Sequence, residues 1–574
     1  MSDLNRRGVS LLAVKERKKL LIGLCILGLF LLPTIIVEAA PVDPTTEQEL
    51  RNKNRLELQQ REKQVNQEDV YLQQEKTDGG LKELPVEEKS FQIDRIVIEG
   101  DLVHRFSWTQ RLVDQYAGQR IGQQGLDIIL NELTEGAINR GMVTTRFQVG
   151  EQDISTGVLR IQLIPGKIGK IYFDEKGQKG SWATAFPTTP GRILDIRDLE
   201  QGLEQLKRVP SQDAKMDLKP GETPGETDVV ITLKKGKAWR AGVTVDDGGS
   251  KSTGKYQGTA SFSLDNVFQH NDTFSYSYVR DLDKHSYIKG SSNHSYSYTF
   301  PLGYWTFSFS AFPSKYHQTV EGIYSYKYSG ESENYVVKAQ RVIHRDTDSK
   351  SLIDLSIGRK FSKSFLDDIE LESQKKDNTY LNFGISKRKN FSTGLVDVRL
   401  GAKRGVHWLG AAEDKIKMKD YPTNNFVIGT FDFNLMQQFQ IKNMDLKYSF
   451  DFKGQATHDN LFGSEYFNIG GRYTVRGFDG ESSLSAENGF YVRNELGIPV
   501  SKWGMEFYLG ADYGQVTGKA TKYLDGNKLA GGAFGVRGGS KGFYYDVFVG
   551  TPFYKPKEFE SPKTVYGFQI GYQY

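Results

Sequence analysis

Residues 446–453 read Leu446-Lys447-Tyr448-Ser449-Phe450-Asp451-Phe452-Lys453, with an apolar side chain at every even position and a polar one at every odd position. This period of two is typical of a β-strand whose faces meet two different solvents. The alternation recurs at 274–278, at 305–309 and in the closing segment 566–574. A soluble sandwich would hide its aromatic faces against a second sheet, yet here the opposite faces carry Lys, Asp, Gln and Ser. The pattern predicts a mainly β fold, a water-filled transmembrane barrel over residues 237–574.

The composition agrees with this fold class. The 574-residue chain has a negative mean hydropathy of −0.51, as expected of barrel strands that place a polar residue beside each apolar one. Its 60 Gly, 30 Tyr and 34 Phe suit tight turns and aromatic girdles. A net charge of +4 from 75 basic and 71 acidic residues indicates no nucleic-acid surface.

The N-terminus is typical of a secretory signal. A basic segment precedes an apolar run from Leu20 to Val37, and small residues follow at Ala39 and Ala40. We expect a signal peptide over residues 1–39 and export across the inner membrane. The alternative is an uncleaved inner-membrane helix, because the run is close to spanning length. The single cysteine, Cys25, lies in this run, so disulfides, thiolate metal sites and a cysteine nucleophile are not expected in the mature chain.

Residues 40–66 predict a helix that is polar nearly all round. Thr46 and Glu49 have capping-box spacing, and Arg51 and Arg55 follow. A helix of roughly 22 residues, at about 1.5 Å each, is about 33 Å long, close to the height of a barrel lumen. We therefore interpret it as a plug. A solvated tail that is only partly helical is the alternative, and a polar linker follows over 67–90.

Two small α+β units precede the barrel. Over residues 91–166 the order is one strand at 91–98, helices at 107–119 and 125–140, then strands at 143–149 and 158–165. Over residues 167–236 a shorter version repeats, with strands at 170–173, 216–219 and 229–234 and a helix at 194–208. Their short strands leave edges that could pair with an extended peptide, although such edges are more often solvated.

Three features give the chain a family resemblance. The first unit contains Glu151-Gln152-Asp153-Ile154-x-x-Gly157-Val158-Leu159, the second contains residues 203–210, and the long segment 461–487 contains Val475-Arg476-Gly477-Phe478. With the plug-like helix, these resemble the two-partner secretion transporters of the hemolysin-activator, filamentous-hemagglutinin and contact-dependent inhibition types. The resemblance implies two POTRA domains and a barrel of sixteen strands. Our own segmentation also gives about sixteen.

The resemblance also implies a latch inside the barrel. In the family this loop folds into the lumen and its arginine pairs with an aspartate on the inner wall. Here Arg476 matches the arginine, and Asp512 is the candidate partner because the alternation along 505–514 places it inward with Gly510 and Gly514. Alternatively, Arg476 caps carbonyl groups of the loop and Asp512 pairs with one of the many other lysines or arginines in the lumen.

The sequence indicates an export pore and no enzyme. The segment 249–255 resembles a phosphate loop, but Tyr256 replaces the required Ser or Thr and a strand follows. No Gly-x-Ser-x-Gly motif occurs, and the eight His have no metal-ligand spacing. We therefore expect no catalytic residue, metal, nucleotide or other cofactor.

The expected protein is a monomer in the outer membrane of a Gram-negative bacterium, with its POTRA domains in the periplasm. The resemblance implies that these domains capture a large secreted exoprotein with an N-terminal secretion domain. That partner would be an adhesin, a hemolysin or a contact-dependent growth-inhibition toxin, with a slight preference for the toxin. An outer-membrane assembly factor of the same superfamily is the alternative. A passive porin would lack the periplasmic repeats.

Overall fold

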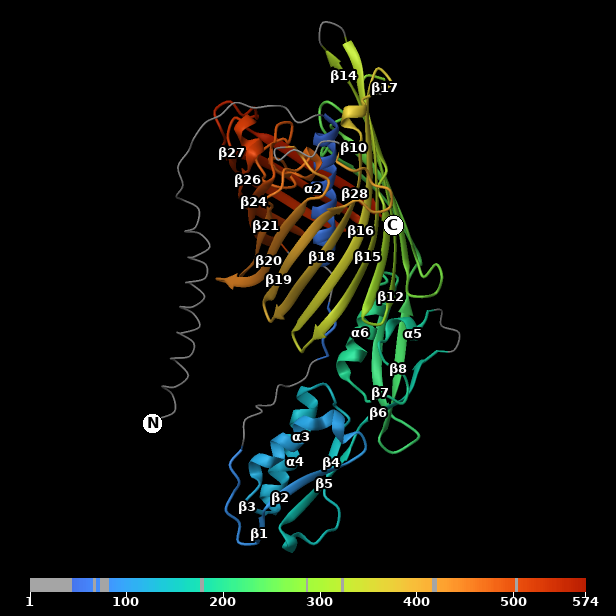
Figure 1. Cartoon of the computed structure of the whole chain (residues 1–574), viewed down its shortest axis with the longest axis vertical. Helices are drawn as coiled ribbons and strands as arrows, with labels where there is room; N and C mark the ends of the chain where they lie inside the picture. The colour runs from blue at the N-terminus through green and yellow to red at the C-terminus, as the bar shows by residue number, and fades with distance from the viewer. Residues whose placement is uncertain are drawn as a thin grey trace, which may run out of the picture.

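The computed structural model describes residues 44–65, 69–72, 82–175, 180–284, 287–321, 325–414, 421–500 and 504–574. The predicted signal peptide and most of the predicted linker lie outside these residues. A tall barrel stands above two α+β units, and one helix runs through the bore of the barrel (Figure 1). No helix within the described ranges combines the length and the apolar character needed to cross a membrane.

The helix in the bore is α2, Pro44–Val65, and it follows the predicted plug segment. Leu50 is its buried apolar residue, at 2 % exposure. The rest of the described helix surface presents mainly polar side chains, which suits a water-filled lumen.

The first α+β unit packs two helices against short strands. Its apolar core includes Ile96, Phe106, Ile129 and Leu133. β2 pairs in parallel with β5, β4 pairs antiparallel with β5, and β1 pairs with β3. The elements are β1 (Ser90–Ile93), β2 (Arg95–Gly100), α3 (Ser107–Val113), β3 (Gln119–Gly122), α4 (Gln123–Asn139), β4 (Arg146–Gln148) and β5 (Val158–Ile164).

Three elements of this unit differ from the sequence prediction, and one of them is the strand expected at 143–149, which is the shorter β4, Arg146–Gln148. The single strand expected at 91–98 is divided at Asp94, because the backbone N–H groups of Asp94 and Arg95 both donate to the carbonyl of Gly157, at 2.8 and 3.1 Å. The helix expected at 107–119 ends at Val113 and continues as a 3₁₀ turn. Gly118 then takes a φ of +79°, which stops the helix and leads into the unpredicted strand β3.

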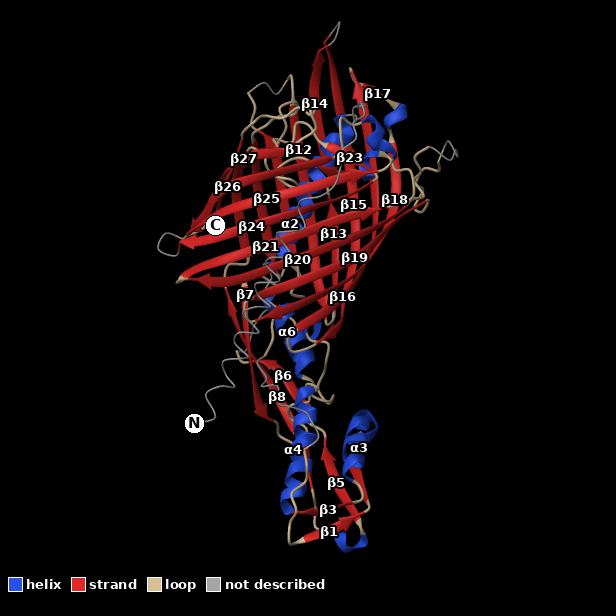
Figure 2. Ribbon diagram, turned by 90° about the vertical axis from the view of Figure 1, so that its left-hand side faces the viewer, coloured by secondary structure: helices blue, strands red, loops and turns tan. Residues whose placement is uncertain are grey.

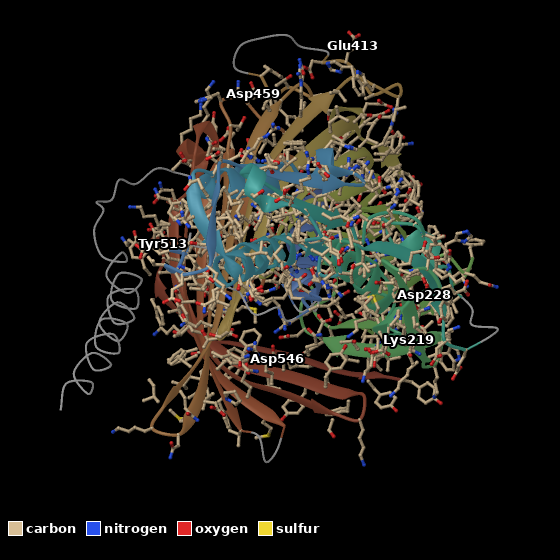
Figure 3. The ribbon with its side chains drawn as sticks, turned by 90° about the horizontal axis from the view of Figure 1, so that it is seen from below. Lys219, Asp228, Glu413, Asp459, Tyr513 and Asp546 are labelled. Atoms are coloured by element: carbon tan, nitrogen blue, oxygen red, sulfur yellow. The ribbon has the colours of Figure 1, made fainter. Side chains whose placement is uncertain are left out.

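The second unit lies between the first unit and the barrel (Figure 1). Its sheet order is β6-β8-β7, with an apolar core that includes Leu199, Leu206 and Ile231. The elements are β6 (Lys167–Phe173), α5 (Trp182–Ala185), α6 (Ile196–Lys207), β7 (Gln212–Pro220) and β8 (Glu226–Lys235). The short helix α5 has no counterpart in the sequence prediction. Viewed from below, Lys219 and Asp228, register partners on β7 and β8, lie side by side at one edge of the molecule (Figure 3).

The barrel closes through β28 and β9 and is antiparallel throughout. Strands β13 and β14 both lie between β12 and β15, so they form one strand interrupted at Phe312 and Pro313, and β17 (Ile369–Glu370) only extends the hairpin of β16. Counted this way, the described residues form sixteen strands, as predicted. The strands are tilted around the barrel (Figure 2).

The strand bounds are as follows: β9 (Trp239–Asp246), β10 (Gln257–Asp265), β11 (Thr273–Asp281), β12 (Gly290–Leu302), β13 (Trp305–Ala311), β14 (Ser314–Glu321), β15 (Ser325–Arg345), β16 (Ser349–Leu366), β18 (Lys376–Phe391), β19 (Gly394–Val406), β20 (Val427–Ile441), β21 (Met444–Ala456), β24 (Asn488–Val500), β25 (Met505–Thr517), β26 (Lys528–Ser540), β27 (Phe543–Tyr554) and β28 (Val565–Gln573). Short turns connect the strands at the end that faces the α+β units, and longer loops connect them at the opposite end. This asymmetry is typical of outer-membrane barrels.

The two faces of the strands meet different surroundings. On β25, Leu509 points outward and is 60 % exposed, whereas Asp512 points into the bore and is 3 % exposed. Phe534 and Tyr566 are also exposed on the outer surface. The alternation read from the sequence therefore divides an apolar outer face from a polar interior.

Candidate functional site: the plugged bore of the barrel

The loop between β21 and β24 turns back into the bore. Within it, β22 (Phe467–Ile469) and β23 (Leu484–Ala486) pair antiparallel. Val475 and Phe478 are buried, in an apolar cluster shared with the barrel wall and the loop before β28. The wall and loop members of this cluster include Val516, Leu529 and Phe559. The loop is thus packed against the inner wall as a small core of its own.

Arg476 is the polar centre of this loop. Its backbone N–H and its Nε donate to Oδ2 of Asp512 at 2.9 and 2.8 Å, and Nη2 donates to Oδ1 at 2.9 Å. The guanidinium also pairs with Glu495 and donates to the carbonyl of Asn494 at 3.0 Å. Arg476 and Asp512 are only 4 % and 3 % exposed. Such a two-pronged, desolvated pair fixes both position and orientation.

The structure therefore brings together the two residues that sequence reasoning linked. Glu495 was missed, although its register partner on β25 is Gly510, one of the predicted inner-wall residues. The alternation along β24 places Glu495 inward, so inspection of that strand would have found it. Arg537 contacts the same carboxylate at 2.8 Å and extends the network across the wall.

Glycines make room for the loop. Gly477 has a φ of +99°, a left-handed conformation that favours glycine. A Cβ on Gly510 would lie 2.4 Å from Nη2 of Arg476, and one on Gly514 would lie 2.9 Å from Cγ2 of Val475. The loop therefore lies close to both predicted inner-wall glycines, and it also lies close to Gly531 on β26, which sequence reasoning missed and where a Cβ would lie 2.1 Å from the carbonyl oxygen of Arg476.

The outer end of α2 is hydrogen-bonded to the opposite wall. Nζ of Lys376 donates to Oγ1 of Thr46 at 2.8 Å, and Nζ of Lys360 donates to Glu49 at 2.9 Å. The helix begins at Pro44, two residues before the cap position that the sequence suggested. Thr46 and Glu49 therefore lie inside the helix and contact the barrel.

The arginines of α2 face a different part of the bore. Nη1 of Arg51 donates to the carbonyl of Gly249 at 3.0 Å, and Nη2 contacts the carbonyl of Gly480 in the inward loop. Arg55 lies 3.9 Å from Asp246 at the end of β9. The helix consequently contacts both the wall and the loop.

Further plug contacts were not foreseen. The hydroxyls of Thr45 and Ser364 are 2.6 Å apart, and Tyr316 lies equally close to Thr45. Nζ of Lys453 donates to Glu57 at 2.6 Å. These partners are hundreds of positions apart in the chain, and no local pattern in the sequence joins them.

A buried ion-pair cluster joins α6 to the near end of the barrel. Arg345, at the end of β15, lies 2.8 Å from Glu204 and 3.4 Å from Glu200, and its Nη1 donates to Gln201 at 3.0 Å. Nζ of Lys350 donates to Glu204 at 2.7 Å. The second α+β unit is thereby fixed beneath the barrel opening.

The described residues offer no obvious chemical centre. Among them, no group of three or more His, Cys, Asp and Glu side chains is placed to hold a metal ion. The segment 249–255 forms the loop between β9 and β10, and the carbonyl of Gly249 is bonded to the plug. The arrangement is that of a polar bore with a helix across it and a loop fixed to its wall.

A sixteen-stranded barrel with an inward loop, an internal helix and two small α+β units at one end defines a POTRA-containing transporter of the outer membrane. Family models bear this out along the chain. The POTRA domain of ShlB type matches residues 91–166, another POTRA domain matches 167–220, and the haemolysin secretion/activation protein ShlB/FhaC/HecB model matches 225–538.

Individual relatives agree with the family models. The outer membrane transporter CdiB-2 of Burkholderia pseudomallei is 36 % identical over 94 % of this chain and 96 % of its own. The outer membrane transporter CdiB of Dickeya dadantii is 30 % identical over 77 % of this chain and 79 % of its own. The structure of CdiB from Escherichia coli, at 23 % identity, has the same fold, with a TM-score of 0.86 over 93 % of this chain and all of that one.

The chain belongs to the ShlB/FhaC/HecB family of haemolysin secretion/activation proteins, the outer-membrane transporters of two-partner secretion. It is a transporter of secreted exoproteins and not an enzyme. Its barrel lies in the outer membrane and its POTRA domains lie in the periplasm. This assignment favours export over the assembly-factor alternative.

Proposed function

We propose that this transporter exports a contact-dependent growth-inhibition toxin through the bore of its barrel, after α2 has left the bore. The chain would work as a signal peptide (1–39), plug helix (40–66), linker (67–90), two POTRA domains (91–166 and 167–236) and a barrel (237–574) that acts as a monomer. The toxin as cargo is supported by the likeness to CdiB-2 along nearly the whole chain. A large exoprotein with an N-terminal secretion domain is the expected form of this partner.

The observation that carries the export step is the polar attachment of α2. Thr45, Glu49 and Arg51 contact the barrel or the loop through hydrogen bonds and ion pairs, and among residues 44–61 of the helix only Leu50 is a buried apolar residue. Polar contacts can be exchanged for water or for polar groups of another chain. A helix held in this way can leave without exposing a large apolar surface.

Capture in the periplasm is supported by one sheet edge of the second unit. In the described residues β7 pairs only with β8, whereas the outer edge of β2 in the first unit is hydrogen-bonded to the side chain of Gln110. Leu218 on β7 is 37 % exposed. An extended segment of the cargo could add to such an edge through backbone hydrogen bonds. Folding of the emerged cargo outside the cell would then prevent its return, because removal of the unfolded form shifts the equilibrium.

The proximity of Thr45 to Ser364 gives a reversible test of plug release. We expect T45C/S364C, in a Cys25→Ser background, to form a disulfide because the two hydroxyls are 2.6 Å apart. The oxidised transporter should block export of a co-expressed growth-inhibition exoprotein, measured as killing of target cells, and reduction should restore it. T45C alone is the matched control. Equal export in the oxidised and reduced states would show that the plug does not have to move.

A further inference from the structure

Four lysines point into the bore from one part of the barrel wall. They lie on β16, β18, β19 and β21, and we call Lys360, Lys376, Lys403 and Lys453 the lysine track. Lys376 lies on β18 opposite Ser362, two residues from Lys360 on β16. Their side chains are 14 to 21 % exposed. The track is therefore a largely covered cationic surface inside the bore.

The plug covers three of the four lysines. Lys360 donates to Glu49 at 2.9 Å, and Lys376 lies 3.8 Å from the same carboxylate. Lys453 donates to Glu57 at 2.6 Å. Glu49 and Glu57 are eight positions apart on one helix, so a single rigid element supplies carboxylates to separate strands.

The inward loop and the barrel wall supply the remaining partners of the lysine track. Lys403 pairs with Glu465 of the loop and lies 4.2 Å from the ring centre of Tyr380. Asp432 on β20 is the register partner of Lys453 and is the wall carboxylate nearest to the track in register. The other three lysines take their carboxylate partners from the plug or the loop, so departure of the plug leaves Lys360 and Lys376 without Glu49.

Acidic wall residues face two arginines of the plug. Arg55 faces Asp246 on β9, and Arg61 pairs directly with Asp451, which lies on β21 two positions from Lys453. The helix thus presents carboxylates to the lysine track and guanidinium groups to acidic positions. Lys53 is the exception, because it lies near Lys403 and Lys453, with Glu57 and Glu465 as its counter-charges. Apart from Lys53, the charges of the plug complement those of the wall, as the charges of a bound ligand would.

We propose that the lysine track binds carboxylate side chains of acidic segments in the unfolded exoprotein while it crosses the barrel, and that Glu49 and Glu57 occupy these sites at rest. The proposal rests on the proposed function, because the plug must leave first. Several weak binding sites, one after another along the bore, let a charged chain enter and leave without becoming trapped. The cargo class is an extended polypeptide that carries Asp and Glu.

The first test measures ion selectivity of the full-length transporter in planar bilayers. The T45C/S364C protein is opened by reduction, and the reversal potential is recorded under a KCl gradient. We expect K360Q/K376Q/K403Q/K453Q in this background to lower the chloride-to-potassium permeability ratio by about threefold or more, because clefts lined by one sign of charge concentrate counter-ions roughly tenfold or more. Four outward-facing lysines, each at least 46 % exposed, provide the control K315Q/K327Q/K363Q/K389Q, which should leave the ratio unchanged.

The second test uses poly-L-glutamate as a probe of the open pore. The polymer should block the reduced parent and the control variant, and the track variant should need at least about tenfold more polymer for the same block, since four cationic sites are lost. The track variant should not need more poly-L-lysine than the parent for the same block. Equal block by poly-L-glutamate in the parent and the track variant, with equal permeability ratios, would overturn the proposal.

The two proposals fail in different ways. If reduction does not raise the conductance, the plug does not leave the bore, and both the export step and the track fall. If reduction opens the pore but the track variant behaves like the control, only the track falls. The heat-modifiable migration of each variant on a gel confirms that its barrel is folded.

Discussion

Removal of either partner of the Arg476–Asp512 pair should release the inward loop without preventing barrel insertion. The Asp512 carboxylate accepts three hydrogen bonds of 2.8 to 2.9 Å from Arg476, two from the guanidinium and one from the backbone N–H. The strands of the barrel do not depend on this pair, because backbone hydrogen bonds within the wall join each strand to its neighbours. We therefore expect Arg476→Ala and Asp512→Ala to give inserted barrels that secrete poorly.

The magnitude follows from burial. Loss of one partner of a desolvated ion pair costs roughly 3–5 kcal/mol, because a buried charge is left uncompensated. At about 1.4 kcal/mol per tenfold, the undocked fraction of the loop should rise by about two to three and a half orders of magnitude. Asp512→Ala belongs at the lower end, since Glu495 still pairs with Arg476. The double variant should cost less than the sum of the two single variants.

Cysteine labelling measures the undocked fraction directly. Ser485, in β23 of the loop, is 2 % exposed, and Ser485→Cys changes little in size. In a Cys25→Ser background, a membrane-impermeant maleimide should label this cysteine slowly in the parent and much faster in the latch variants. Secretion of the exoprotein is measured in the same cells. Lys315→Ala breaks an exposed pair on the outer face, and the loss of such a pair changes stability by less than about 1 kcal/mol. We therefore expect the labelling rate of this variant to stay close to that of the parent.

One outcome would refute this reasoning. If Arg476→Ala, Asp512→Ala and the double variant all labelled and secreted at parental rates, the pair would not hold the loop. Faster labelling with normal secretion would separate the two claims, because the loop would then be latched by this pair but not required for export.

Gly510→Ala keeps every charge but places a Cβ 2.4 Å from Arg476, so loop labelling should rise, whereas Gly429→Ala, with nothing nearer than 3.7 Å, should not change it. Arg345→Ala removes a partner that Glu200 and Glu204 share, while Arg197 still pairs with Glu200 and Lys350 with Glu204, so hydrogen exchange in α6 should increase by an amount near the lower end of roughly 3–5 kcal/mol. Burial raises the pKa of Asp195 to about 6, so the folded POTRA domain holds this proton more tightly than the unfolded chain. Its stability should therefore fall by about 3 kcal/mol as the pH rises from about 4 to about 6, and urea titrations of the periplasmic domain pair should lose this dependence in Asp195→Asn.

The barrel could be predicted from the sequence because its signal is local. Alternation along 505–514 assigns Leu509 and Asp512 to opposite faces without any knowledge of the neighbouring strands. The inward path of the loop could not be obtained in this way, since it depends on Gly510, Gly531 and Gly550, which lie on three neighbouring strands and all meet the loop. Only the family resemblance indicated this path. The pair between Arg345 and Glu204 could not be predicted either, because it joins the end of a barrel strand to a periplasmic helix that is far away in the sequence.

The division between a movable plug and a fixed loop follows from what each one buries. The loop contributes Val475, Phe478 and Leu484 to an apolar cluster, and all three are nearly inaccessible to water. Its detachment would expose that surface at roughly 25 cal/mol per Å² in addition to breaking the Arg476 pair. The plug contributes Leu50 as its buried apolar side chain and otherwise relies on contacts that water or a passing polypeptide can replace. On this argument, an incoming chain displaces the helix at a lower free-energy cost than the loop, and the loop can remain on the wall while the bore opens.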